Sequence, residues 1–169
     1  AAIQSNAESV TPVTVTAQLS ALSGQAVSVP FTLGGTAANP ADYTNTASPI
    51  VIPAGQLSTS ATITVVDDLS DEANETVIVT MGAPTNATQG ATTVHTATIT
   101  DDDNPPTVSW TAASQSNAES VTPVTVTAQL SATSGLAVSV PFTLGGTAAN
   151  PADYTNTASP LSIPAGQTT

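Results

Sequence analysis

The stretch from Gln4 to Ser20 reads QSNAESVTPVTVTAQLS, and Gln115–Ser131 repeats it without a change. From Pro12 to Leu19 the stretch alternates apolar residues with Thr and Gln, and Val13–Thr16 consists entirely of the β-branched residues Val and Thr. A period of two with many β-branched side chains is typical of a half-buried β-strand, because successive side chains of a strand point to opposite faces. The stretch therefore predicts a strand near the start of each copy.

The repetition extends well beyond this stretch, at a constant offset of 111 residues. Residues 4–58 differ from residues 115–169 at six of 55 positions, which are Leu22/Thr133, Gln25/Leu136, Ile50/Leu161, Val51/Ser162, Leu57/Thr168 and Ser58/Thr169. Such near-identity indicates recent duplication and a tandem array. We expect one nearly complete repeat in residues 1–103, lacking its first strand, and the N-terminal part of a second, incomplete repeat in residues 104–169.

Four further runs along the repeat show apolar residues with a period of two. They are Gln25–Leu33, Ala61–Val66, Glu75–Met81 and Thr92–Thr100. Turn-forming Gly, Pro and Asn residues separate them, and no window shows the 3.6-residue period of a helix. About seven short strands in some 111 residues predict an all-β fold, an immunoglobulin-like antiparallel β-sandwich built as tandem repeats.

The composition limits the partners of the chain. It contains no Lys or Arg and twelve acidic residues, which give a formal net charge of −12. Phosphate backbones and anionic lipids are bound through Lys and Arg side chains, which this chain lacks. We therefore expect no nucleic-acid binding and no direct membrane binding. Hydrophobic residues make up 40% of the chain and charged residues only 7%, which favours a folded protein over a disordered one. The charged partners that remain are cations.

The acidic residues gather at turns and strand ends. They are Glu8, Asp42, Asp67, Asp68, Asp71, Glu72, Glu75, Asp101, Asp102 and Asp103, with Glu119 and Asp153 in the second copy. Because strands reverse direction at each turn, the loop from Asp67 to Glu75 and the run Asp101–Asp103 should lie at one end of the sandwich. Carboxylates about 4 Å apart repel by roughly 4 kcal/mol per pair at an effective dielectric near 20. An oxygen-rich cluster without His or Cys suits Ca²⁺. The alternative is a solvated acidic loop without a metal.

Four sequence elements together resemble the Calx-beta domain, known from sodium–calcium exchangers, an integrin subunit and very large bacterial surface proteins. They are Ala41-Asp42-Tyr43, Ile52-Pro53-Ala54-Gly55, the Asp67-to-Glu75 loop and Thr98–Asp103. The resemblance implies calcium binding by Glu8, Asp42, Asp67, Asp68, Glu72, Glu75 and Asp101–Asp103. Asp71 is added to this metal set without a family role. Leu69 and Asn74 stand where many members carry acids, which would weaken one calcium position. A cadherin-like repeat is the rival family, and its linker pattern matches less well.

Two other residues invite a chemical role. His95 is the only histidine and Trp110 the only tryptophan. His95 lies in a predicted strand without a nucleophile in its context, so a structural role is favoured over catalysis. Trp110 fits a core or junction aromatic better than a sugar-stacking platform. We therefore expect no enzyme activity.

These patterns predict a calcium-binding extender repeat of a large extracellular or cell-surface adhesin, stiffened by Ca²⁺ where one repeat joins the next. A regulatory calcium-sensor module of a transporter-like protein is the alternative, and an accessory module of a secreted enzyme is another. Expected partners are calcium ions, neighbouring repeats and strands from another copy. The strands of the incomplete second copy should need such a partner over Val124, Val126, Val138, Val140 and Phe142, and calcium should bind the first copy alone.

Overall fold

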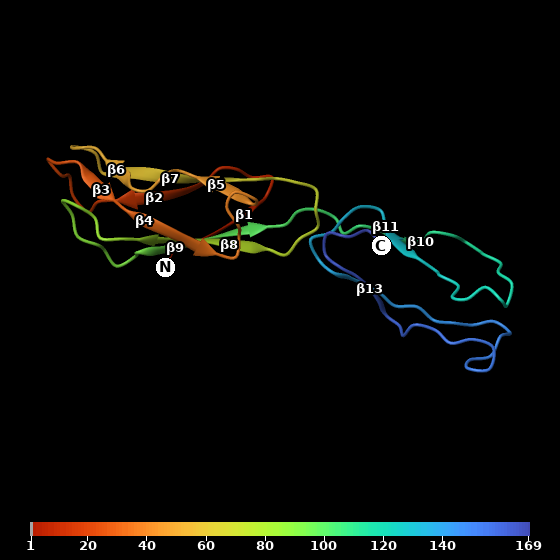
Figure 1. The fold of residues 1–169 in the computed structure, drawn as a ribbon. Coiled ribbons are helices and arrows are strands. Elements are labelled where there is room, and N and C mark those ends of the chain that lie inside the picture. Colours follow the sequence, from red (N-terminus) through yellow and green to blue (C-terminus); the bar gives the residue numbers. More distant parts are fainter. Residues whose placement is uncertain (1) are drawn as a thin grey trace. The chain divides into compact units, whose positions relative to one another are not determined.

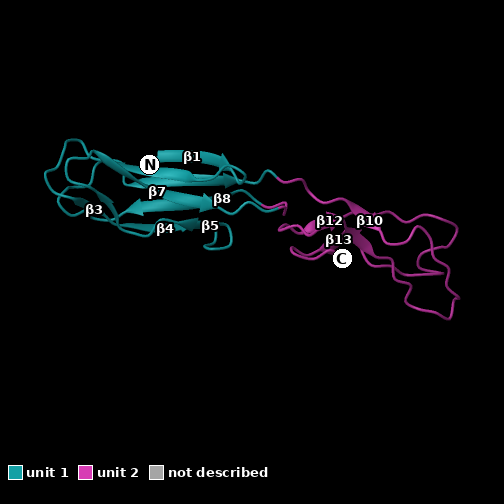
Figure 2. Cartoon of the chain, turned by 90° about the horizontal axis from the view of Figure 1, so that it is seen from above, with its two compact units in different colours: residues 1–68, 73–102 teal, residues 69–72, 103–169 magenta. Residues whose placement is uncertain are grey.

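The computed structural model describes residues 2–169, which form two compact units (Figure 2). The first unit comprises the residues up to Asp68 together with Ala73–Asp102. The second comprises Leu69–Glu72 and Asp103–Thr169. Strands and turns account for the regular structure of residues 2–169, so this part of the chain offers no apolar helix of membrane-spanning length.

Nine strands build the first unit. They are β1 (Ala2–Ala7), β2 (Val13–Gln18), β3 (Val27–Val29), β4 (Phe31–Gly35), β5 (Tyr43–Asn45), β6 (Ile50–Ile52), β7 (Ser58–Val65), β8 (Glu75–Met81) and β9 (Val94–Thr100). One sheet has the order β1-β9-β8-β4, and facing it are the sheet β2-β7-β5 and the pair β3-β6 (Figure 1). Every pairing is antiparallel except that of β1 with β9. The predicted all-β sandwich is confirmed.

The core of the first unit comes from the inward positions of these strands. Its buried members include Val13, Val27, Ile52, Ile63 and Val77, each 0–2% exposed. They alternate along their strands with exposed or half-buried Thr and Ser, as in Val13–Gln18 and Ser58–Val65. Burying one face of each sheet against the other removes this apolar surface from water, which is the main force that holds a sandwich together.

The run predicted as one strand over Gln25–Leu33 is two strands in the structure. β3 pairs with β6, whereas β4 pairs with β8 in the other sheet, and Pro30 separates them. Proline has no N–H for a ladder hydrogen bond, so the chain changes sheets at this residue. The next N–H, that of Phe31, donates to Ser48 Oγ at 2.8 Å. The period of two continues through both strands, since the alternating residues Val27, Val29 and Phe31 are all buried.

The second unit contains two short hairpin-like pairs. They are β10 (Val108–Trp110) with β11 (Ala128–Leu130), and β12 (Val138–Val140) with β13 (Leu161–Ile163). Their small core consists of Ala128, Leu130, Val140 and Ile163.

Part of the second copy lacks the strands that its first-copy counterpart forms. Val13 in β2 is 1% exposed, whereas its counterpart Val124 is 50% exposed and lies outside any strand. Val126 is exposed too, although Val140 is buried and Val138 and Phe142 are half-buried. In the first copy β2 is paired with β7, and Val13 is opposite Ile63. Coverage of this face by another protein stays a prediction.

Candidate metal centre

Strand register brings several acidic segments to one end of the first unit. In the parallel β1–β9 pair Ala7 is opposite Thr100, so Glu8 and Asp101 both follow strands that end side by side. Glu75 opens β8 opposite Ile99 in β9. Tyr43 is opposite Val65, so the residues before β5 and after β7 meet at one end as well. The strand reversals deduced from the sequence therefore occur.

Three of the predicted ligands converge closely. Glu8, Asp68 and Asp103 each offer one carboxylate oxygen, and these oxygens lie within 4.8 Å of one another. Glu8 is only 9% exposed, and its backbone N–H donates to the carbonyl oxygen of Thr100 at 3.1 Å. Charges at this spacing repel by about 3 kcal/mol per pair at an effective dielectric near 20, and solvent at the exposed Asp68 lowers this value. The cluster is therefore suited to a cation.

Asp101 and Asp102 are held in place by two residues that sequence reasoning did not assign to the site. The side-chain oxygen of Asn74 accepts a hydrogen bond from the Asp101 N–H at 3.0 Å, and Ser9 Oγ donates to Asp102 Oδ2 at 2.5 Å. Asp101 Oδ1 is buried and has no hydrogen-bond partner among the described residues. A buried carboxylate oxygen without a donor is destabilising unless a cation binds it, so this atom fits a metal ligand.

Asp42 has a structural contact of its own. Its Oδ2 accepts a hydrogen bond from the Ala38 N–H, and its backbone carbonyl accepts one from Val66 at 2.9 Å. The second copy repeats the first of these contacts between Asp153 and the Ala149 N–H at 2.7 Å. Burial raises the pKa of the adjacent Tyr43 phenol, and the charge of Asp42 adds to the rise. Asp42 thus shapes its loop whether or not it binds a metal.

The other predicted ligands lie at different places along the loop between β7 and β8. Asp67 is exposed directly after β7, and Glu75 is half-buried at the start of β8. Glu72 belongs to the segment Leu69–Glu72, which is part of the second unit. There Glu72 lies so close to Gly135 that a Cβ added at that glycine would be 2.7 Å from Glu72 Oε1. None of these residues belongs to the group of three carboxylates that converge, Glu8, Asp68 and Asp103.

Asp71 contacts a turn of the second copy. Ser134 Oγ lies 3.1 Å from both the backbone carbonyl oxygen and Oδ2 of Asp71, and the Gly135 N–H donates to the same carbonyl at 3.0 Å. Ser134 is only 1% exposed. In the first copy the corresponding Ser23 bonds within its own turn, to Gln25. The hydroxyl of Ser134 therefore holds the Leu69–Glu72 segment.

Substitution Ser134→Ala should loosen this segment. Removing a buried hydroxyl leaves its partners without a donor or acceptor, which costs about 1–2 kcal/mol. We expect the Gly135 amide to exchange with deuterium roughly 5- to 30-fold faster. Ser23→Ala is the matched control, since it changes the same repeat position without an Asp71 contact, and should leave the exchange of Gly135 as it was. Equal exchange in both variants would show that Ser134 does not hold the segment.

Comparison with known proteins identifies the family. The Calx-beta domain model matches residues 2–103 and again residues 101–169, so the chain belongs to the Calx-beta family. A search of curated proteins found no match.

Three solved structures are similar in fold. CBD12 from CALX1.2 is 21% identical with a TM-score of 0.54, and the match covers 60% of this chain and 42% of that one. The calcium binding domain CBD12 of CALX1.1 is 20% identical with a TM-score of 0.56, with coverage of 66% and 46%. The apo-form Calx CBD1 domain is 22% identical with a TM-score of 0.53, with coverage of 60% and 91%. The chain thus spans less than half the length of the first two.

Proposed function

We propose that this chain is a calcium-binding module whose ion binds at the end of the first unit where β9 finishes. The observation that carries the proposal is the convergence of Glu8, Asp68 and Asp103 in a chain without Lys or Arg. No arginine or lysine is available to neutralise these carboxylates. A hard divalent cation coordinated by oxygen is the partner that their chemistry favours.

Each residue has a definite part in this proposal. Glu8, Asp68 and Asp103 supply the central oxygens, and Asp101 adds a buried oxygen that has no hydrogen-bond donor among the described residues. Asn74 and Ser9 hold the Asp101–Asp102 segment in place. Asp67 and Glu75 are close along the chain to this group and complete the proposed set. Asp71 is peripheral, because its Oδ2 and its backbone carbonyl face Ser134.

A regulatory calcium-binding role has more support than the extender role predicted first. The similar structures are described as calcium-binding domains or as CBD domains of Calx, and CBD12 names two domains in one chain. Near-identity of the two copies at 49 of 55 positions is what favours an extracellular extender of an adhesin. A sensor should change its hydrogen exchange over a narrow range of calcium concentration, whereas an extender should stay saturated in millimolar calcium.

Calorimetric titration with calcium tests the proposal. The full chain should bind with a dissociation constant of about 0.1–10 μM. Glu8→Gln and Asp68→Asn should each weaken binding at least tenfold, because each removes a charge from the central group. Glu119→Gln is the matched control, since Glu119 is the exposed second-copy counterpart of Glu8. Asp71→Asn should have little effect. Equal loss of affinity in Glu8→Gln and Glu119→Gln would refute the assigned site.

A further inference from the structure

A turn of the second unit binds the segment Leu69–Glu72, which we name the acidic segment. Ser134 Oγ lies 3.1 Å from both the carbonyl oxygen and Oδ2 of Asp71, and the Gly135 N–H donates to the same carbonyl at 3.0 Å. The acidic segment covers this turn closely, since Ser134 is only 1% exposed and a Cβ added at Gly135 would lie 2.7 Å from Glu72 Oε1. The turn therefore recognises the segment through the Ser134 hydroxyl, a backbone N–H and close contact with a carboxylate.

The first unit carries the same turn with the same backbone hydrogen bond. Ser23 and Gly24 stand where the second copy has Ser134 and the glycine after it. In the first unit the Gly55 N–H donates to the Ser23 carbonyl at 2.9 Å, and in the second unit the Gly166 N–H donates to the Ser134 carbonyl at 2.8 Å. The backbone that receives the acidic segment in the second unit is therefore already formed in the first.

This turn of the first unit, which we name the open turn, has no segment bound to it. Gly24 is exposed, and a Cβ added there would have no heavy atom within 4 Å. The Gly24 N–H has no hydrogen-bond partner among the described residues. Ser23 Oγ donates within its own turn, to the Gln25 carbonyl at 2.8 Å. Rotation of this one hydroxyl would present two donors to a carboxylate and a carbonyl, as in the second unit.

Exposed leucines flank the open turn. Leu22 is 66% exposed and Leu57 is 42% exposed, and threonine stands at both positions in the second copy. The acidic segment brings an exposed leucine of its own, since Leu69 is 88% exposed. Contact between these leucines would remove apolar surface from water and add to the hydrogen bonds. The open turn is therefore at least as well suited to the segment as the turn of the second unit.

The charge distribution of the first unit also favours this end. Gln18 at the end of β2 is opposite Ser58 at the start of β7, whereas Asp67 follows the other end of β7 (Figure 1). The ranges 20–25 and 53–57, which form the open turn and the turn bonded to it, contain no acidic residue. A negatively charged segment therefore meets less repulsion at the open turn than at the acidic end of the unit.

We propose that the open turn is a docking site for the acidic segment of a second copy of this chain. Ser23 Oγ and the Gly24 N–H bind Asp71, and Leu69 packs on the flanking leucines. Within one copy the segment is held by Ser134, so the contact between copies competes with an equivalent internal contact. The joint links different surfaces of two molecules, which allows copies to associate in open chains. None of the three converging carboxylates takes part, so the joint is independent of the proposed calcium site.

Titration of the full chain with a peptide of residues 67–75 tests the docking site, with the amide signals followed by NMR. We expect the Gly24 and Gln25 amides to shift and to saturate with a dissociation constant of roughly 1–5 mM. The Gly135 amide should stay in place, because its turn already holds the segment. An Asp71→Asn peptide should bind at least about fivefold more weakly, since a charge-assisted hydrogen bond is lost. A Gly24 amide that does not move at saturating peptide would overturn the docking site.

Two valine substitutions in the full chain give a matched comparison. Gly24→Val introduces a side chain into open space, so the fold should be kept, yet this side chain occupies the place that Glu72 takes over Gly135 in the second unit. We expect it to weaken binding of the peptide at least about fivefold. Gly34→Val, in β4 and likewise in open space, should bind the peptide as the unchanged chain does. Equal affinities of the two variants would show that the open turn is not the binding site.

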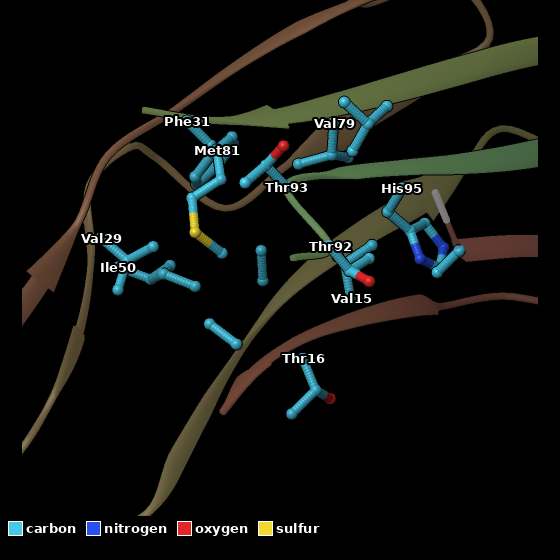
Figure 3. A pocket seen from close by; sticks show the side chains of 14 residues that line it. Val15, Thr16, Val29, Phe31, Ile50, Val79, Met81, Thr92, Thr93 and His95 are labelled. Atoms are coloured by element: carbon cyan, nitrogen blue, oxygen red, sulfur yellow. The ribbon is translucent and has the colours of Figure 1, made fainter. Parts of the chain in front are cut away.

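An apolar cavity of the first unit is a competing site for the leucine of the peptide. Its volume is about 100 Å³, and Val15, Phe31 and His95 are among the residues that line it (Figure 3). No residue of the open turn lines this cavity. Shifts of the His95 signals in place of those of Gly24 would assign the peptide to the cavity and overturn the proposed site.

The variant Ser134→Ala tests whether a second copy is the occupant. The substitution weakens the internal contact and releases the acidic segment, so the Gly24 amide should shift with rising protein concentration, in the direction that the peptide causes. Adding Ser23→Ala should abolish this dependence on concentration. A Gly24 signal that is independent of concentration up to the millimolar range, in a chain that binds the peptide, would overturn the second copy as the occupant.

Discussion

The first unit should melt roughly 10–20 °C higher in millimolar calcium than in EDTA. Calcium at 100 times its dissociation constant stabilises the folded state by about 2.7 kcal/mol, and one such ion is expected here. The ion also removes the repulsion among Glu8, Asp68 and Asp103, whose oxygens lie within 4.8 Å of one another. Thermal melting of the full chain followed by circular dichroism, with hydrogen exchange to distinguish the units, measures the effect.

The matched substitutions make this result specific to the site. Glu119→Gln should keep the full difference between calcium and EDTA, whereas Asp68→Asn should reduce it. Asp68 is exposed, so its replacement should not disturb the core. Magnesium at the same concentration should stabilise less, because it gives up its water less readily than calcium does. Melting temperatures that agree within a degree or two in calcium and in EDTA would exclude the calcium function.

Gly35→Ala should destabilise the first unit by about 3 kcal/mol or more. Gly35 ends β4 with a φ of +114°, and a Cβ at this position would lie 2.0 Å from the backbone oxygen of Thr76. That oxygen cannot move away cheaply, since it accepts hydrogen bonds from the N–H groups of Thr36 and Ala37 at 3.0 and 3.1 Å. The chain would have to break these bonds or separate β4 from β8.

Gly146 is the control that the repeat provides for this prediction. It is the counterpart of Gly35, has nearly the same φ of +115°, and has no heavy atom within 4 Å of an added Cβ. Gly146→Ala should therefore cost only the backbone strain of a positive φ, about 1 kcal/mol. Urea denaturation, with the two units distinguished by hydrogen exchange, compares the variants. Similar losses of stability for both would show that contact with Thr76 does not matter.

The long strands were predictable from the sequence, and the short ones were not. Glu75–Met81 was predicted with the bounds that β8 has, because seven residues of alternating and β-branched character leave little ambiguity. β5 and β6 are three residues each, too short to show a period. β1 was recognised only as part of the repeated stretch, and its parallel pairing with β9 depends on contacts between residues about 93 positions apart.

The candidate site, like the strands, was predictable from the sequence only in part. Composition and spacing alone identified the acidic residues and their common end of the sandwich, because strand reversal is a local property of turns. Which carboxylates approach one another depends on contacts distant in sequence, so only the fold distinguishes Glu8, Asp68 and Asp103 from the rest. The same holds for Asn74 and Ser9, whose contacts cross 27 and 93 residues.

By itself the sequence determined the repeat, the all-β class, the absence of cationic side chains and the set of candidate ligands, because these depend on residue types and near neighbours. Only the tertiary structure decided which neighbours surround a residue, and these neighbours differ between equivalent positions of the two copies. Gly35 and Gly146 have the same backbone conformation, yet only Gly35 has Thr76 against it. Phe31 and Phe142 occupy the same repeat position, yet only Phe142 has a tryptophan beside it. Packing depends on which strands are present to supply the neighbours, and a residue's own position in the repeat does not contain that information.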